Sequence, residues 1–167
     1  MANETKPIGI DATGYDLLTN AVKALLNQFP GLYEGEKIKF EELGESDGIA
    51  FSADNGALVM SERITITGKV IQNCQYLFYV VYRSASNRES YKIDVQSFLD
   101  TLGKWICREW VSINDENIRL AGYPDLTNGR KVKRVTRTNS YGLQPREDGV
   151  QDWLLPCTIE YTNEYYR

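Results

Sequence analysis

The side chains that most often carry out acid–base chemistry are scarce in this sequence. The chain has no histidine, which removes the commonest general base, the usual zinc ligand and every histidine-dependent catalytic triad. Adjacent carboxylates occur at Glu41-Glu42 and Asp115-Glu116, and two carboxylates can in principle act as acid and base. Neighbouring strand residues point to opposite faces, however, so these pairs are more typical of a solvated acidic surface. We therefore expect no enzymatic activity.

Other motifs that carry chemistry are absent or incomplete. The sequence has no P-loop, GxGxxG, CxxC or GxSxG motif. Asp54-Asn55-Gly56 resembles part of a calcium-binding loop, but the remaining ligand positions are missing and the residues favour a plain turn. Cys74, Cys107 and Cys157 are odd in number and far apart, which predicts buried free thiols in a reducing cytosol. We expect no cofactor and no metal site.

Charge is distributed unevenly along the chain. The net charge of −4 argues against a dedicated nucleic-acid-binding protein, because such proteins neutralise phosphates with Lys and Arg. One region is acidic and contains Glu34, Glu36, Glu41, Glu42, Glu45, Asp47 and Asp54. A later segment is basic and contains Arg130, Lys131, Lys133, Arg134 and Arg137.

The basic segment is the strongest candidate for a functional surface. Strand alternation would place Lys131, Lys133 and Arg137 on one face and the side chains between them on the other. They could be ordinary solvent-facing residues, contact nucleic acid, or contact the acidic region of a neighbouring copy around Glu41 and Glu42. The last interpretation suits a protein that is acidic overall.

Tyrosines near the end of the sequence form a second candidate surface. Tyr161, Tyr165 and Tyr166 lie in a segment that would usually be polar. Tyrosine combines a large apolar ring with a polar hydroxyl group and is enriched at interfaces. These residues either pack on their own domain or lie in a subunit interface, which gives Tyr165 and Tyr166 as interface candidates.

Two amphipathic helices are predicted to position these surfaces. Residues 15–29 form the first helix, which is capped by Asp11 or Thr13 and ended by Pro30-Gly31. Its apolar face contains Leu18, Val22, Leu25 and Phe29. The second helix begins between residues 87 and 91, with Ser90 or Asn87 as the cap, and Gly103 within it indicates close packing. Its apolar stripe contains Val95, Phe98, Leu99, Leu102, Trp105 and Ile106.

Short alternating segments predict the strands. Ile38 and Phe40 lie in the first, residues 48–52 form another, and a turn is expected over residues 52–56. Residues 63–70 and 75–83 should form an antiparallel hairpin that turns at Gln72-Asn73. Residues 112–128 are irregular in pattern.

Two further strands complete the pattern. Residues 131–138 form one, and residues 151–161 form the last. One face of the last strand contains Trp153, Leu155, Cys157, Ile159 and Tyr161. Pro156 lies between them and indicates a sheet edge or a bulge, because proline cannot donate a ladder hydrogen bond.

The order of elements predicts an α+β fold, with an antiparallel sheet and two main helices packed on one face. The face of the second helix with Val95, Leu99, Leu102 and Ile106 should pack on Trp153, Leu155 and Ile159. Residues 1–167 suit a single domain with a short flexible N-terminal segment over about residues 1–10. No apolar run is long enough for a signal peptide or a membrane span, so we expect a soluble protein that remains where it is synthesised.

Several segments together resemble the tail terminators of tailed phages and phage-tail-like particles, proteins that are often labelled minor capsid protein. The resemblance covers residues 75–166, and the N-terminal half agrees only in the order of its elements. The segments are Gln75-Tyr76-Leu77-Phe78, Arg83-Ser84-Ala85-Ser86-Asn87, Phe98-Leu99 running to Trp105, Tyr123-Pro124-Asp125-Leu126-Thr127-Asn128-Gly129, Asp148-Gly149-Val150-Gln151-Asp152-Trp153 and Cys157-Thr158-Ile159-Glu160-Tyr161.

The resemblance implies a structural subunit that forms a ring, usually a hexamer, at the head-proximal end of the tail tube. It also implies the tail tube protein and neck, collar or sheath proteins as partners, DNA only in transit, and no membrane. Assembly would occur in the host bacterial cytoplasm, before the protein becomes part of a virion tail or tail-like particle. A head–tail connector subunit of the neck and a nucleic-acid-contacting module are the alternatives.

Overall fold

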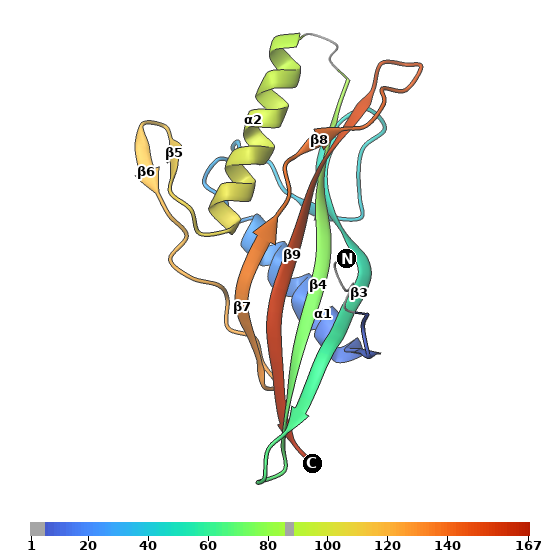
Figure 1. The fold of residues 1–167 in the computed structure, drawn as a ribbon. Coiled ribbons are helices and arrows are strands. Elements are labelled where there is room, and N and C mark those ends of the chain that lie inside the picture. Colours follow the sequence, from blue (N-terminus) through green and yellow to red (C-terminus); the bar gives the residue numbers. More distant parts are fainter. Residues whose placement is uncertain (1–5, 86–88) are drawn as a thin grey trace, which may run out of the picture.

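The computed structural model describes residues 6–85 and 89–167. Within them, two helices and nine strands follow one another (Figure 1). Their bounds are β1 Gly9–Ile10, α1 Ala12–Leu26, β2 Lys39–Phe40, β3 Gly48–Ile64, β4 Lys69–Ser84, α2 Glu89–Ile106, β5 Val111–Ile113, β6 Glu116–Ile118, β7 Arg130–Arg137, β8 Tyr141–Gly142 and β9 Gln151–Tyr166.

One mostly antiparallel sheet organises the protein and confirms the predicted α+β class. Its strand order is β1-β3-β4-β9-β7, with β2 parallel to β3 and β8 antiparallel to β9. The strands β3, β4 and β9 are 17, 16 and 16 residues long and form a tall central ribbon (Figure 1). One face of this ribbon shares a single apolar core with both helices. The other face, called the open face below, has no helix of the described chain against it.

Helix α1 begins as the sequence predicts and ends earlier. Asp11 is the N-cap, and its side chain accepts a hydrogen bond from the Gly14 amide. This bond satisfies one of the amides that has no partner within the helix. The predicted end near Phe29 is too late, because the helix stops at Leu26, although Phe29 is still buried in the core.

Helix α2 confirms its predicted apolar stripe. Val95, Leu99, Leu102 and Ile106 are buried in one cluster with Leu155 and Ile159 of β9, and half-buried Trp153 packs against it. A Cβ on Gly103 would lie 2.5 Å from Arg137 Cδ and 3.2 Å from Leu155 Cδ1, which explains the glycine. The suggested cap Asn87 lies outside the described residues, as does the side chain of Ser90.

The predicted β3–β4 hairpin is correct, but its predicted turn is wrong. Residues 65–68 form the turn, and Gln72 and Asn73 lie within β4, opposite Glu62 and Ser61. Gln72 donates to Glu62 at 2.9 Å and Asn73 donates to Ser61 at 2.9 Å. These cross-strand hydrogen bonds stabilise polar residues within a strand. Gly68 instead supplies the positive φ of the turn, at 84°.

The turn predicted over residues 52–56 is also wrong, since β3 continues through it. Asn55 and Gly56 adopt positive φ angles of 61° and 72°. The register with β4 shifts between Asp54 and Ala57, which is the signature of a bulge. The irregular segment 112–128 contains the small β5–β6 hairpin, whose turn includes Asn114 and Asp115 at positive φ.

The prediction that Pro156 marks a sheet edge or a bulge is wrong, since β9 lies between β4 and β7 and no register shift occurs at this residue. Pro156 lies instead where pairing along one side of β9 is interrupted. Strand β7 pairs as far as Cys157, and β8 pairs from Leu154. The Pro156 carbonyl accepts a hydrogen bond from the Thr138 amide at 3.1 Å. The N and C=O of an antiparallel strand residue face the same neighbour, so the missing N–H faces the gap between β7 and β8.

Two of the three cysteines are buried as predicted. Cys74 and Cys157 are buried, Cys107 is half-buried, and all three are free thiols. Burial raises the pKa of Cys74 to about 11, which disfavours the reactive thiolate. Across the described part of the chain, neither helix is long and apolar enough to cross a membrane.

Candidate subunit interface

The basic strand β7 has a different geometry from the simple alternation that the sequence predicts. A bulge between Val132 and Arg134 shifts the register with β9. Lys131 and Arg134 therefore lie opposite Thr162 and Glu160 on the open face, whereas Arg137 lies opposite buried Cys157. The prediction that Arg137 shares a face with Lys131 is wrong, because the extra residue of the bulge reverses the alternation.

Arg137 packs toward the helices and is not a free surface cation. Its side chain is 18% exposed, with a nitrogen 3.8 Å from a Glu109 carboxylate oxygen. Its alkyl part occupies the space that Gly103 leaves open on α2. This residue helps to attach β7 to the helix layer, so it is a poor candidate for an intermolecular contact.

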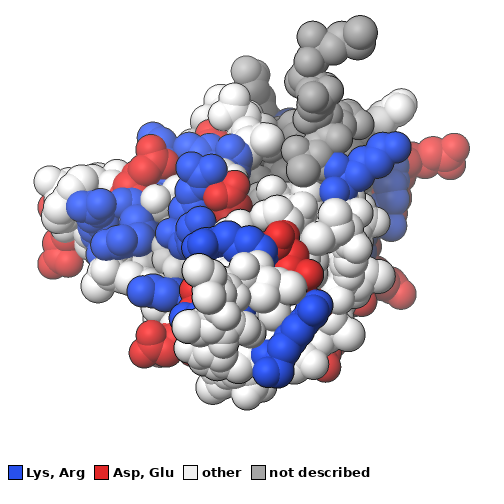
Figure 2. Space-filling view, turned by 60° about the horizontal axis from the view of Figure 1, so that its bottom comes forward, with Lys and Arg blue, Asp and Glu red and all other residues white. Residues whose placement is uncertain are grey.

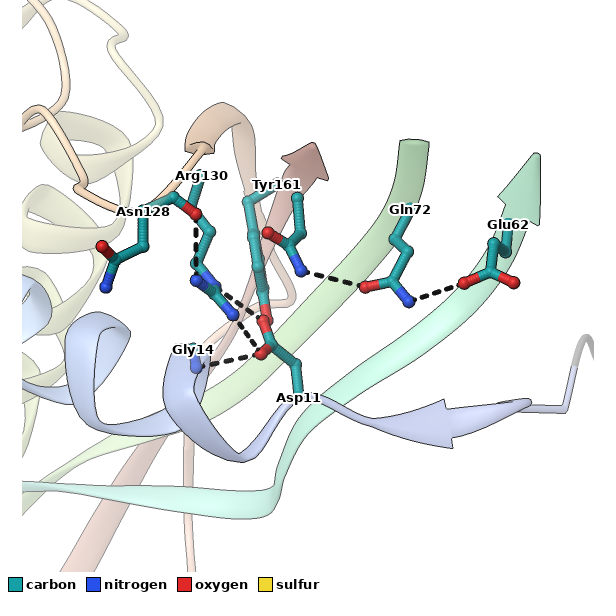
Figure 3. Close-up of polar contacts among 8 residues, drawn as sticks. Asp11, Gly14, Glu62, Gln72, Asn128, Arg130 and Tyr161 are labelled. Carbon is teal, nitrogen blue, oxygen red and sulfur yellow. Dashed lines mark hydrogen bonds and ion pairs between the residues drawn. The ribbon is translucent and has the colours of Figure 1, made fainter. Parts of the chain in front are cut away.

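Arg130 forms the most buried ion pair in the described chain (Figure 3). Its guanidinium donates to both Asp11 oxygens, at 2.9 and 2.5 Å, and to the Asn128 carbonyl at 3.1 Å. The Tyr161 hydroxyl donates to the same carboxylate at 2.7 Å, as does the Gly14 amide at 3.0 Å. The pair connects the start of α1 with β7 and β9.

Electrostatics in this cluster favour the charged pair. Burial alone raises the pKa of Asp11, but hydrogen bonds from Arg130, Tyr161 and Gly14 outweigh it and hold that pKa below its ordinary value. Burial, and next the hydrogen bond to Asp11, raise the pKa of Tyr161. The sequence indicated Asp11 only as a helix cap and Arg130 only as a surface cation, since 119 residues separate them.

The other basic residues of β7 lie toward solvent. Arg134 pairs with Glu160 on the open face, an interaction that is worth little where the side chains are exposed. Lys131 and Lys133 are exposed, and neither forms an ion pair with any described residue of the chain. The predicted basic surface is therefore reduced to these two lysines and the partly neutralised Arg134.

The tip of the β3–β4 hairpin adds residues to the basic end of the sheet. We define the tip as Arg63, Ile64, Ile66 and Lys69. Ile64 is 51% exposed and Ile66 is fully exposed. Lys69 pairs with Glu164 at 2.8 Å, and the Arg167 amide donates to the Gly68 carbonyl at the turn.

Tyr165 and Tyr166 lie beside the tip, at the end of β9. They pair with Val70 and Lys69 and are 40% and 69% exposed. Tyr161 is buried, so this tyrosine packs on its own domain while the later two remain available for an interface. Figure 2 brings this end forward and shows Lys and Arg side chains spread across it, with Asp and Glu between them.

The acidic candidates lie at the opposite end of the central ribbon. We call residues 41–47 the acidic loop, which leads into β3 and contains exposed Glu41, Glu42, Glu45 and Asp47 with no basic residue. Glu42 pairs with Lys39 at 3.3 Å, and Glu41 accepts from Ser52 at 3.1 Å. The other predicted acidic residues are elsewhere, with Glu34 and Glu36 between α1 and β2 and Asp54 at the bulge.

The two charged ends cannot meet within one chain. The Glu41 amide donates a hydrogen bond to the Phe51 carbonyl, so the acidic loop lies beside Phe51. Lys131 lies opposite Thr162, which lies opposite Asn73 of β4 and, beyond it, Ser61 of β3. The matching stretch of β4, from Val80 to Asn73, has seven residue steps, which at about 3.3 Å each separate the two by roughly 23 Å along the sheet. Glu41 and Glu42 can therefore contact Lys131 or Lys133 only in another copy of the chain.

A groove lies on the open face beside the acidic loop. Its volume is about 570 Å³. Its floor contains Ala50, Val81 and Leu154, which lie opposite one another on the neighbouring strands β3, β4 and β9. Leu43 of the acidic loop and Leu143 line its sides, and Glu41 lies among the lining residues. We call this feature the open-face groove.

Arg83 holds the acidic loop beside the groove. It donates to both oxygens of Asp152, at 2.7 and 3.0 Å, and to the Gly44 carbonyl at 2.9 Å. The hydrogen bond from Arg83 lowers the pKa of Asp152. Arg146 adds a second link, because its guanidinium donates to the Glu45 carbonyl at 2.6 Å. The loop is therefore attached to both β4 and the segment before β9.

The geometry presents a basic, partly apolar tip at one end of the sheet and an acidic loop beside a groove of mixed polar and apolar lining at the other. Such an arrangement can join copies head to tail. In comparisons with known proteins, no protein-family model and no curated protein matches the chain.

Proposed function

We propose that the chain is a structural subunit that assembles into a ring, and that this ring ends a phage-type tail tube at its head-proximal side and joins it to the neck or collar. The observation that supports assembly into a ring is the separation of acidic and basic residues along the central ribbon. The acidic loop lies at one end and Lys131, Lys133 and the hairpin tip lie at the other.

Contacts between two different patches of the same protein are heterologous. They repeat from copy to copy and close into a ring when the rotation between neighbours permits. Complementary charge favours this association and disfavours pairing of like ends. The usual hexamer of the resembled family is the expected copy number.

The assignment to a tail rests on the sequence resemblance. Two of the resembling segments lie side by side in the fold, because Arg83 of one forms the bidentate pair with Asp152 of another. A third segment packs under α2 through Tyr123, whose hydroxyl donates to the Ile106 carbonyl at 2.8 Å. These contacts place three of the resembling segments together in the fold, and the α+β sheet agrees with the class that the resemblance implies.

Mass measurement of the purified full chain tests the ring. We expect one closed oligomer by native mass spectrometry, seen as a ring in negative-stain images. The tail assignment is tested separately, by adding the ring to growing tubes of a tail tube protein and measuring tube length. We expect elongation to stop, and a chain that remains monomeric or leaves elongation unchanged would contradict the corresponding part of the proposal.

The exposed Lys131 and Lys133 favour nucleic-acid contact as the second candidate function. The pairing of Arg130, Arg134 and Arg137 with carboxylates weighs against it, since these cations are already engaged. A nucleic-acid-binding module would bind duplex DNA with a steep salt dependence, and Lys131→Glu would reduce that slope by about one per lost phosphate contact. We expect only weak binding that is lost at physiological salt.

A further inference from the structure

We infer that the hairpin tip of one copy docks into the open-face groove of the next copy, with Ile66 inserted between Leu43 and Leu143. This inference rests on the proposed ring function and identifies the surfaces that would join neighbouring subunits. It commits to a second copy of this chain as the occupant of the groove.

Hydrogen bonds within the single chain already fix the conformation of the tip. Ile66 is fully exposed in the turn, just beyond the last ladder pair, Ile64 with Val70. The Thr65 and Thr67 hydroxyl groups hydrogen bond at 3.0 Å, and the Lys69 amide donates to Thr65 Oγ1 at 3.1 Å. These bonds fix the turn, so little conformational freedom is lost on binding.

The groove offers a partly apolar surface, and Ser52, Tyr79 and the Arg83–Asp152 ion pair also line it. Ala50 and Val81 form its floor and are nearly buried, while Leu143 is 43% exposed at its side. The hydrogen bonds that Arg83 and Arg146 donate to carbonyls of the acidic loop hold the rim in place.

Charge complementarity identifies the occupant. The tip contains Arg63 and Lys69, and Arg167 lies beside it, although Lys69 already pairs with Glu164. The acidic loop has four carboxylates, of which Glu42 pairs with Lys39, and the cation that lines the groove, Arg83, is paired with Asp152. Both patches belong to the same chain at opposite ends of β3, so a tip cannot enter its own groove. A second copy therefore offers a groove to the tip of the first, and a third copy offers a tip to the groove of the first. Repeated docking produces a head-to-tail chain of subunits that can close into a ring.

Two complementary variants test this docking on the full chain. Ile66→Asp places a charge on the tip, and Leu143→Asp places one in the groove. Each should raise the concentration needed for half-assembly at least about tenfold, because an unpaired charge would be buried in the contact. Ile93→Asp is the matched control, since Ile93 is 57% exposed on α2 and belongs to neither surface. Circular dichroism melting checks that every variant remains folded.

Mixing the two variants gives the sharpest result. The Ile66→Asp chain keeps an intact groove and the Leu143→Asp chain keeps an intact tip, so together they can form one productive contact and no second one. We expect a heterodimer from the mixture, and monomers from a chain carrying both substitutions. Absence of the heterodimer, or wild-type-like rings from either single variant, would overturn the docking while leaving the ring proposal intact. A wild-type chain that forms no ring would remove both proposals.

Discussion

Residues that are close in sequence and alike in chemistry have different roles according to the face of the strand on which they lie. On β7, Arg130 is buried against Asp11 while Lys131 is exposed without an ion pair among the described residues. On β9, Tyr161 is buried and hydrogen bonded to Asp11, whereas Tyr166 is largely exposed beside the hairpin tip. The comparison between this internal cluster and the exposed basic end shows that the strand face, and not the residue type, decides whether a side chain stabilises the fold or is available for assembly.

The largest expected effect comes from breaking the internal cluster at Arg130. Arg130→Met should reduce the free energy of unfolding by about 3–5 kcal/mol, because it leaves the Asp11 carboxylate buried without its partner. Lys131→Met is the matched control and should change stability by less than about 0.5 kcal/mol. Urea denaturation monitored by tryptophan fluorescence measures both. Equal effects for the two variants would contradict the contrast drawn between them.

A smaller effect is expected from removing the hydroxyl group of one buried and one exposed tyrosine of β9. Tyr161→Phe should cost about 1.5–3 kcal/mol, since a hydrogen bond to a charged group is lost in the core. Tyr166→Phe should leave stability unchanged within about 0.5 kcal/mol. Thermal and urea unfolding of the two variants provide the measurement, and a neutral Tyr161→Phe would show that the Asp11 carboxylate does not need this donor.

The free energy of unfolding should depend on pH through the titration of the Asp11 carboxyl group. Its folded pKa is lowered below the unfolded value of about 3.9, so its contribution is fully present above about pH 5 and is lost as the pH falls through the folded pKa. Asp11→Asn retains a good helix cap but lacks this titration. The stability difference between wild type and Asp11→Asn should therefore narrow as the pH falls below about 4. A difference that stays constant down to pH 3 would contradict the assignment.

The smallest effect on folding, with a large effect on assembly, is expected at the exposed end. Lys131→Glu combined with Lys133→Glu should change the free energy of unfolding by no more than about 1 kcal/mol while weakening oligomer formation. Assembly of the wild type should also weaken as salt is raised, because exposed charges are screened over about 10 Å at 0.1 M. Light scattering across a salt series measures this. Oligomers that persist unchanged would assign these lysines to another role.

The sequence predicted those features that depend on near neighbours. The three- and four-residue spacing from Val95 to Ile106 predicts the buried face of α2, and the alternation from Leu155 to Tyr161 predicts the core face of β9. The Asp11 cap follows from its position just before an amphipathic segment. The α+β class follows from the order of these elements, since each of them has to bury one face.

Only the tertiary structure decided the register of the strands and the pairs that it creates. Gln72 and Asn73 are turn-forming residues locally, yet hydrogen bonds to Glu62 and Ser61 on the neighbouring strand accommodate them within β4. The bulge in β7 turns Arg137 inward, and the fold brings Arg130 to Asp11 across 119 residues of sequence. The physical reason is that helix faces and caps depend on side chains a few residues apart, whereas strand register and buried ion pairs depend on partners that local patterns do not identify.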